Sequence, residues 1–553
     1  MRAQWSTLDV KLRSSLSEAV VSRSPQLTQQ GLSNTLWALQ EMGVVLYPAS
    51  VPVSVEGRSR IKDTESSRMR ESLTSATLRL AHVLSAQSYS TIVYSMAMMG
   101  CQYMALEHSL RTALEAACSR VGPAMGPKEI SLALYGLGKM NMLLRSVSSS
   151  TRNTLLSAVA EHCGGMDEQE LGNTVWALSH VGHSVTEESG RVLLSRVVEM
   201  QQDLQWQSLL AILQGIGSTH RGPEDAAEGA DADDLTRERS RTRWSELPVS
   251  LQNALLATLT RLLGQDGTSV CNSKMVGTAL YWLGRLQTSY FGLSVSLRSQ
   301  LIAQVSSPNC LIVKSTVRDK VEHNGRAGTG SGAGHPVVLA MNGIASMGAT
   351  WGLLEAEDRE LLESAVACCL SLQQQDTGTA AAVQASASAG GRGNTAAVLA
   401  PGDVSSLLWS LGRMGLQIGS LWSPSPTAAL SSSDSTLGSV EEVGSEKAAA
   451  GKAGLGAAVI LSEPTQQRGN ALEFNLLNAL EVTVSGMSAY EVAWCMWALA
   501  RMGLTFSDLI ASKRPLGSLL LVVINKHIVN MAERELGIVL WVSTHRAGIL
   551  NHL

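Results

Sequence analysis

The sequence predicts an all-α protein: an α-solenoid of helix-turn-helix repeats of about 38–41 residues each, in about ten copies, with disordered insertions. One observation is a recurring phrase, of which GLSNTLWALQEMG at 31–43 and EVAWCMWALARMG at 491–503 are two copies. A second is its spacing, which is 35 to 44 residues between neighbouring copies that no insertion separates. A third is composition, because aromatic residues make up only 4% of a chain that is 45% hydrophobic, which favours helix packing.

The copies align on the residue at Trp37, which we call the register position. Eight copies have an aromatic residue there: Trp37, Tyr94, Tyr135, Trp176, Tyr281, Trp409, Trp497 and Trp541. The residue after it is usually small, and the residue two after it is nearly always Leu, Ile or Met, which extends an amphipathic helical stripe. A large ring beside a small neighbour lets two helices approach closely. We therefore expect the ring to pack between repeats, with base stacking as the alternative.

Each copy also carries signals for the two ends of a helix. Six residues after the register position stand residues that accept the left-handed conformation at a helix C-terminus: Gly43, Gly100, Asn141, Gly182, Gly217, Gly348, Gly415 and Gly503. Asp167 with Glu170, and Ser488 with Glu491, have the spacing of capping boxes at helix starts. Each copy is therefore predicted to be one capped helix, which we call helix B.

A second amphipathic stretch precedes most copies, as in RESLTSATLRLAHVL and ALEFNLLNALEVTV. The predicted unit is therefore helix A, a turn and helix B, and stacking of units buries each apolar face. The helical repeats are predicted at 1–219 (about five), 247–372, 402–419 and 471–553. Between them lie an acidic and basic disordered insertion at 220–246, a low-complexity linker at 373–401 and a low-complexity insertion at 420–470. A Gly-rich loop at 322–336 lies within the repeats at 247–372.

Charge and motifs exclude several functional classes. The formal net charge is −4, so the chain is not a highly basic, nonspecific binder. The most apolar run, from Leu516, reaches Asn525 and Lys526 too soon to span a bilayer. His180 and His183 lack a partner at metal-site spacing, and GTGSGAG lacks the strand and the Lys-Ser/Thr of a phosphate loop. We therefore expect no enzymatic activity, no cofactor, no metal and no membrane span.

The repeated phrase resembles helix B of a known repeat family. LSNTLWAL and DEQELGNTVWALSHVG are similar to the second helix of octotricopeptide repeats and of the related heptatricopeptide repeats, over the chain from about residue 11 less the insertions. The Pro-rich opening of octotricopeptide repeats and a RAP domain are not recognisable. The resemblance implies a chloroplast or mitochondrial RNA-binding protein that acts in transcript stability, processing or translation. Its partners would be single-stranded organellar RNA and other proteins of an RNA-processing complex. The N-terminus itself reads either as a transit peptide or as a first amphipathic helix.

Binding of single-stranded RNA requires side chains that hydrogen-bond or stack on bases, beside cations for the phosphates. On helix B, the positions seven and three before the register position, the register position and four after it share one face. The candidate RNA-binding residues on or near that face are Asn34, Lys128, Lys139, Asn173, His180, Lys274, Arg285, Arg413 and Arg501. The cations in the last turn could equally complement the helix dipole. The alternative function is a protein-protein interaction scaffold of HEAT or armadillo type, which a nearly neutral chain would suit.

Overall fold

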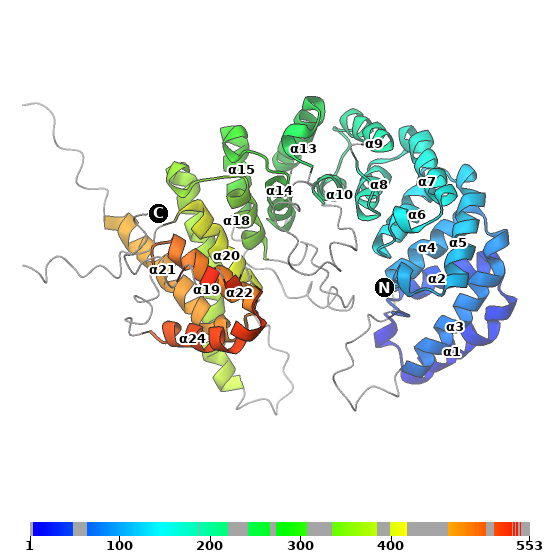
Figure 1. Cartoon of the computed structure of the whole chain (residues 1–553), viewed down its shortest axis with the longest axis horizontal. Helices are drawn as coiled ribbons and strands as arrows, with labels where there is room; N and C mark the ends of the chain where they lie inside the picture. The colour runs from blue at the N-terminus through cyan, green and yellow to red at the C-terminus, as the bar shows by residue number, and fades with distance from the viewer. Residues whose placement is uncertain are drawn as a thin grey trace, which may run out of the picture. The chain divides into compact units, whose positions relative to one another are not determined.

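The computed structural model describes most of the chain as helices joined by short turns (Figure 1). The described residues are 4–47, 63–185, 187–218, 242–265, 273–306, 335–383, 399–416, 463–504, 514–532, 535–536, 538–539 and 542. None of these residues lies in a β-strand. The chain forms two compact units: residues 1–304 with 313–347, and residues 305–312 with 348–553. The predicted all-α class is confirmed over the described residues, and the helices pack against their neighbours in sequence order, which is consistent with a helical repeat.

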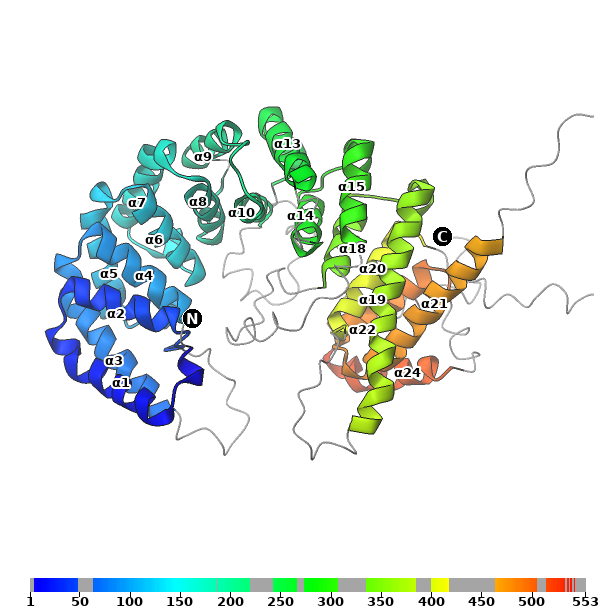
Figure 2. The same ribbon diagram turned by 180° about the vertical axis from the view of Figure 1, so that it is seen from behind.

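The first unit alternates helices of the two predicted kinds. Its A helices are α1 (Val10–Arg23), α3 (Asp63–Leu80), α5 (His108–Val121), α7 (Ser149–His162), α9 (Glu188–Glu199), α13 (Val249–Gln265) and α15 (Val295–Val305). Its B helices are α2 (Gln29–Glu41), α4 (Ala86–Met98), α6 (Pro127–Lys139), α8 (Glu168–His180), α10 (Trp206–Gly217), α14 (Ser273–Arg285) and α18 (Pro336–Ser346). Each B helix packs on the next B helix, and α1, α3, α5, α7, α9 and α13 form a second row in the same way (Figures 1 and 2).

The second unit continues the alternation with α19 (Ala356–Val383), α20 (Pro401–Met414), α21 (Glu463–Thr483), α22 (Ala489–Arg501) and α24 (Leu516–His527). Here the A helices α19 and α21 pack together, as do the B helices α20 and α22. The apolar stripe of each B helix is buried, as Leu407, Leu408 and Leu411 are in α20. Burial of these stripes on neighbouring helices is the main stabilising contribution that the sequence pattern predicts.

A backbone hydrogen bond closes each of five repeats in the first unit. A short 3₁₀ turn precedes the A helix, and its first residue donates its N–H to the carbonyl five residues after the register position of the following B helix. These bonds are Trp5 to Met42 (2.8 Å), Tyr103 to Met140 (2.9 Å), Leu144 to Val181 (2.8 Å), Trp244 to Leu286 (2.7 Å) and Tyr290 to Met347 (3.1 Å). A carbonyl at a helix C-terminus has no partner within the helix, so the bond satisfies it and fixes the start of each repeat.

Helix ends follow the predicted caps with one exception. Six of the seven predicted glycines have positive φ, between 74° and 97°, and Asn141 has φ 54°. The capping boxes at Asp167 and Ser488 are formed. The prediction is wrong for Gly217, which is the last residue of α10 and precedes an extended Ser218. A Cβ on Gly217 would lie 3.0 Å from Cε3 of Trp282, so this glycine serves close packing.

Gln287 occupies the left-handed position after α14, where other repeats have glycine, with φ 57°. Because a residue with a Cβ is strained there, we expect Gln287→Gly to raise the free energy of unfolding by about 0.5–1 kcal/mol. The reciprocal change, Gly348→Gln, should lower it by about 1 kcal/mol, since φ is 78° and a Cβ would meet no atom within 4 Å. Urea unfolding followed by circular dichroism measures both. Equal shifts in the same direction would contradict the explanation by backbone strain.

Several predicted boundaries need correction. Helix α19 extends to Val383, past the end predicted at 372, because QQQ at 373–375 and AAA at 380–382 are good helix formers. Helix α21 begins at Glu463, inside the predicted 420–470 insertion, with Pro464 in its favoured place in the first turn. The 3₁₀ turn at Trp244–Glu246 lies inside the predicted 220–246 insertion. The remaining parts of the predicted insertions lie outside the described residues.

Candidate nucleic-acid interface

The face that the sequence singled out is the solvent-facing side of the B helices that have an aromatic register residue. We call its residues the B-helix strip. In the first unit they are Gln30, Asn34, Trp37 and Glu41 of α2; Gln87, Thr91, Tyr94 and Met98 of α4; Lys128, Leu132, Tyr135 and Lys139 of α6; Gln169, Asn173, Trp176 and His180 of α8; and Lys274, Thr278, Tyr281 and Arg285 of α14. In the second unit they are Gly402, Ser406, Trp409 and Arg413 of α20, and Tyr490, Trp494, Trp497 and Arg501 of α22. Nearly all are exposed or half-buried, and Trp176 is the buried member of this set.

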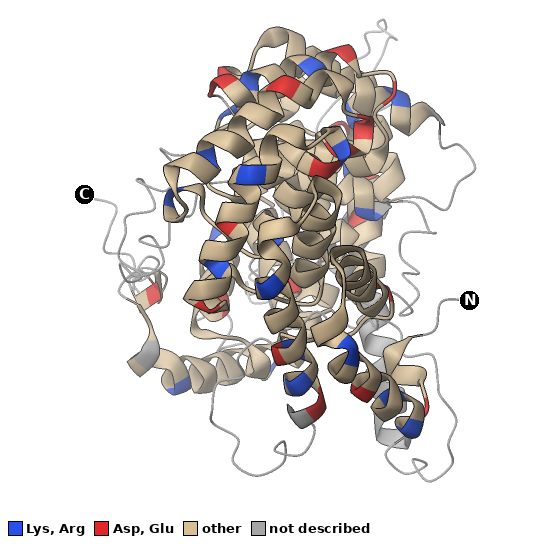
Figure 3. Ribbon diagram, turned by 90° about the vertical axis from the view of Figure 1, so that its right-hand side faces the viewer, with Lys and Arg blue, Asp and Glu red and all other residues tan. Residues whose placement is uncertain are grey.

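The strip differs in charge from the chain as a whole. It carries six Lys or Arg residues, and its only carboxylate is that of Glu41. The net charge of the whole chain, in contrast, is −4. Figure 3 shows Lys and Arg interspersed with Asp and Glu on the helices seen from that side. The excess of cations on the strip favours an anionic ligand.

The register residues of four consecutive B helices form a continuous row of rings, which we call the aromatic ladder. The ring centroids of Trp37 and Tyr94 are 5.7 Å apart, those of Tyr94 and Tyr135 are 6.1 Å apart, and those of Tyr135 and Trp176 are 4.9 Å apart. Each contact joins one repeat to the next at a separation favourable for aromatic pairs. The expected role in packing between repeats and a role in ligand binding use this same arrangement.

Small residues allow the B helices to approach closely enough for the ladder to form. A Cβ on Gly136 would lie 2.9 Å from the backbone N and Cα of Tyr94. A Cβ on Gly138 would lie 3.1 Å from Cζ3 of Trp176. When the backbones of two α-helices approach this closely, the register side chains of the two helices come into contact. The rings and the glycines are thus parts of one packing arrangement.

Cations of the strip lie over register rings of their own or a neighbouring repeat. The Lys139 ammonium is 5.3 Å from the ring centroid of Tyr135 and 4.7 Å from that of Trp176. In the second unit, the Arg413 guanidinium is 5.0 Å from the Trp409 centroid and the Arg501 guanidinium is 5.8 Å from the Trp497 centroid. These are cation-π contacts. Within a helix they arise because the cation follows the register residue by four positions, which is one helical turn. Neither interpretation of these cations from the sequence, phosphate binding or complementing the helix dipole, included them. The contacts hold the cations at the surface of the strip.

His180 stacks on Trp176 of its own helix, with ring centroids 3.7 Å apart, and its Nδ1 lies 2.8 Å from the Trp176 carbonyl oxygen. Burial disfavours the charged imidazolium and the Lys139 ammonium repels it, so the pKa of His180 is lowered to about 4. His180 is therefore neutral at pH 7. It can supply a ring face or a hydrogen bond to a ligand, but no charge.

Because the pKa of His180 is lowered in the folded chain, the free energy of unfolding depends on pH. His180 takes up a proton near pH 6.5 in the unfolded chain but only near pH 4 in the folded chain. Its contribution to the free energy of unfolding is therefore fully present above pH 6.5 and is lost as pH falls from 6.5 to about 4. The loss from pH 7.5 to 5 attributable to His180 is about 2 kcal/mol. We expect His180→Phe, which keeps a ring on Trp176, to abolish this contribution to the loss. Urea unfolding at pH 7.5 and at pH 5 measures it. His335, whose pKa burial also lowers to about 4, remains as an internal reference.

The other candidate residues are distributed along the strip. Asn34 is exposed and accepts a hydrogen bond from Nε2 of Gln30 at 3.0 Å. Lys128 and Lys274 are exposed at the starts of α6 and α14, whereas Asn173 and Arg285 are half-buried. The structure thus brings Lys139 and His180 together with the ladder, and places Arg413 and Arg501 over the register rings of their own helices. Trp541 lies outside the described residues.

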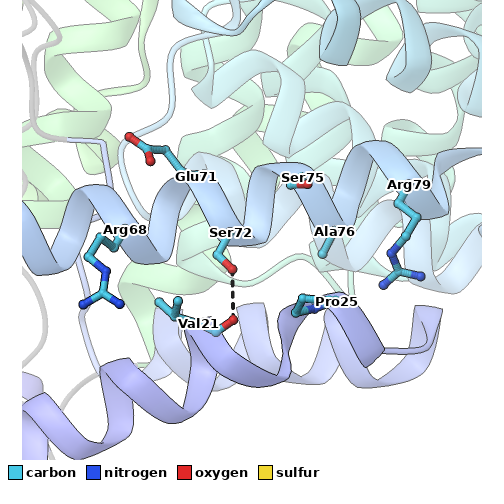
Figure 4. Close-up of a pocket in the computed structure, with 8 residues that line it drawn as sticks. All are labelled: Val21, Pro25, Arg68, Glu71, Ser72, Ser75, Ala76 and Arg79. Carbon is cyan, nitrogen blue, oxygen red and sulfur yellow. Dashed lines mark hydrogen bonds between the residues drawn. The ribbon is translucent and has the colours of Figure 1, made fainter.

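A shallow groove between the A helices α1 and α3 is a separate surface feature (Figure 4). Ser72 Oγ donates to the carbonyl of Val21 at 3.2 Å, and Arg79 donates to the carbonyls of Ser24 and Leu27. Ser72 and Arg79 are therefore used to join α3 to α1 and to the turn that follows it. Among the described residues, no three or more His, Cys, Asp and Glu side chains are grouped as metal ligands would be. None of the described helices is both long and apolar enough to cross a membrane.

No protein-family model matches this chain, and no curated protein matches it. The resemblance to octotricopeptide repeats therefore depends on the residues of the repeated phrase.

Proposed function

We propose that the chain is an α-solenoid that binds single-stranded RNA along the B-helix strip, in a chloroplast or mitochondrion, and acts there in transcript stability, processing or translation. The organelle and the process come from the resemblance to octotricopeptide repeats. The protein would act by occupying the RNA, without chemistry of its own. The row of B helices in each unit supports the solenoid, because each repeat contacts its neighbours in chain order.

The observation that carries the proposal is the composition of the B-helix strip. Amide side chains recur at its edge in Gln30, Asn34, Gln87, Gln169 and Asn173. Amides donate and accept hydrogen bonds together, as the edges of nucleobases do. Six cations accompany a single carboxylate, which suits phosphates. Bases and phosphates of an unpaired strand would both find partners on the part of the strip that each unit carries.

Single-stranded RNA fits this surface better than a duplex. The edges of bases in an RNA duplex are largely withdrawn into a deep groove, whereas amides on a helix face can reach the edges of unpaired bases. The six cations lie on four of the B helices, two each on α6 and α14 and one each on α20 and α22, and do not form a dense field. Affinity should therefore come from many modest contacts that each repeat contributes once, with preference for particular base sequences.

The charge of the whole chain favours the alternative, a scaffold of HEAT or armadillo type that binds proteins. Crosslinking the full chain in isolated organelles and sequencing the bound RNA distinguishes the two. The proposal predicts enrichment of one or a few transcripts at defined single-stranded positions. Recovery of no enriched transcript, together with a protein that co-purifies in fixed proportion, would support the scaffold instead.

A further inference from the structure

The aromatic ladder is closed to intercalation. A base inserted between two rings needs two aromatic contacts of about 3.5 Å each, or roughly 7 Å between the rings. The centroids of Trp37, Tyr94, Tyr135 and Trp176 are 4.9 to 6.1 Å apart, and the rings already touch across neighbouring helices. Opening one gap would separate two B helices whose backbones are in contact at Gly136. The inner rings are therefore unable to hold bases between them.

Trp37 is different, because its ring ends the ladder. Tyr94 stacks on it at an interplanar angle of 26°, and no B helix among the described residues packs on the opposite side of α2. The residue is 41% exposed, and the following Ala38 is exposed too. Of the described residues of α2, α4, α6 and α8, Trp37 is the only large apolar one that is exposed. The Trp37 ring is thus partly exposed, and among the described residues only Tyr94 stacks on it.

The surroundings of the Trp37 ring point to a nucleobase. Gln30 and Asn34, both exposed, lie on the same face of α2 and their amides are hydrogen-bonded to each other at 3.0 Å. A flat ring beside amide groups offers stacking and edge hydrogen bonds to a heteroaromatic ligand. A protein-binding anchor would instead be expected among other exposed apolar side chains, which the strip around Trp37 lacks.

We propose that the outer face of Trp37 is a stacking platform for one unpaired base of the bound strand, with Gln30 and Asn34 beside its edge. This inference rests on the proposed RNA-binding function. Tyr94, Tyr135 and Trp176 set the spacing of the B helices. Bases along α4, α6 and α8 are then recognised by the polar side chains of the strip and not by intercalation.

The test combines variants of the full chain with RNA that lacks one base. Affinity for a single-stranded target is measured by fluorescence anisotropy, with an abasic nucleotide placed at each position in turn. For the wild-type chain, an abasic nucleotide at one position of the target should weaken binding by about 5- to 100-fold. Trp37→Leu should weaken binding of the intact RNA by the same factor and show no further loss at that position. Trp37→Phe, which keeps a ring, should retain most of the affinity.

Phe291→Leu is the matched control, because Phe291 is 40% exposed and lies in a turn before an A helix. It should bind like the wild type at every abasic position. The inference is overturned if Trp37→Leu also binds like the wild type, or if sedimentation shows that Trp37→Leu dissociates a dimer while RNA affinity is unchanged. If the wild-type chain binds no RNA at all, the proposed function is overturned together with this inference, so the two failures are distinguishable.

Discussion

Replacing Gly343 of α18 by alanine is expected to lower the free energy of unfolding by about 3 kcal/mol or more. An added Cβ would lie 2.6 Å from the backbone N of Tyr281 and would overlap the carbonyl of Leu280. The obstruction is backbone, which cannot rotate away as a side chain can. Gly284 of α14 faces Gly343 at the same crossing, where a Cβ would lie 2.6 Å from the Gly343 carbonyl oxygen. The two helices would have to move apart to accept even one methyl group.

The measurement is urea unfolding of the full chain, followed by circular dichroism. Gly352→Ala is the control, because a Cβ there would meet no atom within 4 Å and the residue lies in the 3₁₀ turn at Trp351–Leu353. This control should change stability by less than about 0.5 kcal/mol. Similar losses in the two variants would show that close helix approach does not explain why glycine occupies position 343.

Removing cations from the B-helix strip is expected to have the largest effect on RNA binding. The variant changes to glutamine the exposed strip residues Lys128, Lys139, Lys274 and Arg413. Each phosphate contact on a single strand contributes about 0.7 to the slope of log affinity against log salt. The slope should therefore become shallower by about 3 and affinity at ~0.1 M salt should fall on the order of a hundredfold. Titrations by fluorescence anisotropy over a range of KCl concentrations measure both.

A second fourfold variant separates this effect from that of total charge. It changes four exposed cations outside the strip: Lys11, Arg23, Arg191 and Lys526. The loss of formal charge is the same, but the slope should change by less than about 1 because no phosphate contact is removed. If the two variants lower the slope equally, the RNA is held by the general field of the protein and the strip has no special part.

The sequence predicted most of the fold because its signals are local. The apolar stripe through Leu32, Leu36 and Leu39 and the glycine at position 43 both lie within one helix, and the structure shows that helix with those residues buried and Gly43 left-handed. Local pattern failed where a distant residue decided the conformation. Gly217 remains helical because Trp282, on another B helix, packs against it.

The features of the candidate site that were missed depend on distances between repeats. The carbonyl that accepts the bond from Trp5 belongs to Met42, and nothing in either side chain signals a bond between two backbone groups. The charge state of His180 depends on burial and on Lys139 from another helix. The cation-π contacts could have been found, because a Lys or Arg four residues after an aromatic residue is one helical turn away.

The most direct measurement is ultraviolet crosslinking of the full chain to a bound single-stranded RNA, with the modified peptides located by mass spectrometry. The account predicts adducts on peptides from the B helices, above all those that contain Trp37, Asn34 and Lys139. Adducts confined to A helices, or to the segments between the repeats, would contradict it. So would the absence of any adduct under conditions in which an unrelated single-strand-binding protein crosslinks efficiently.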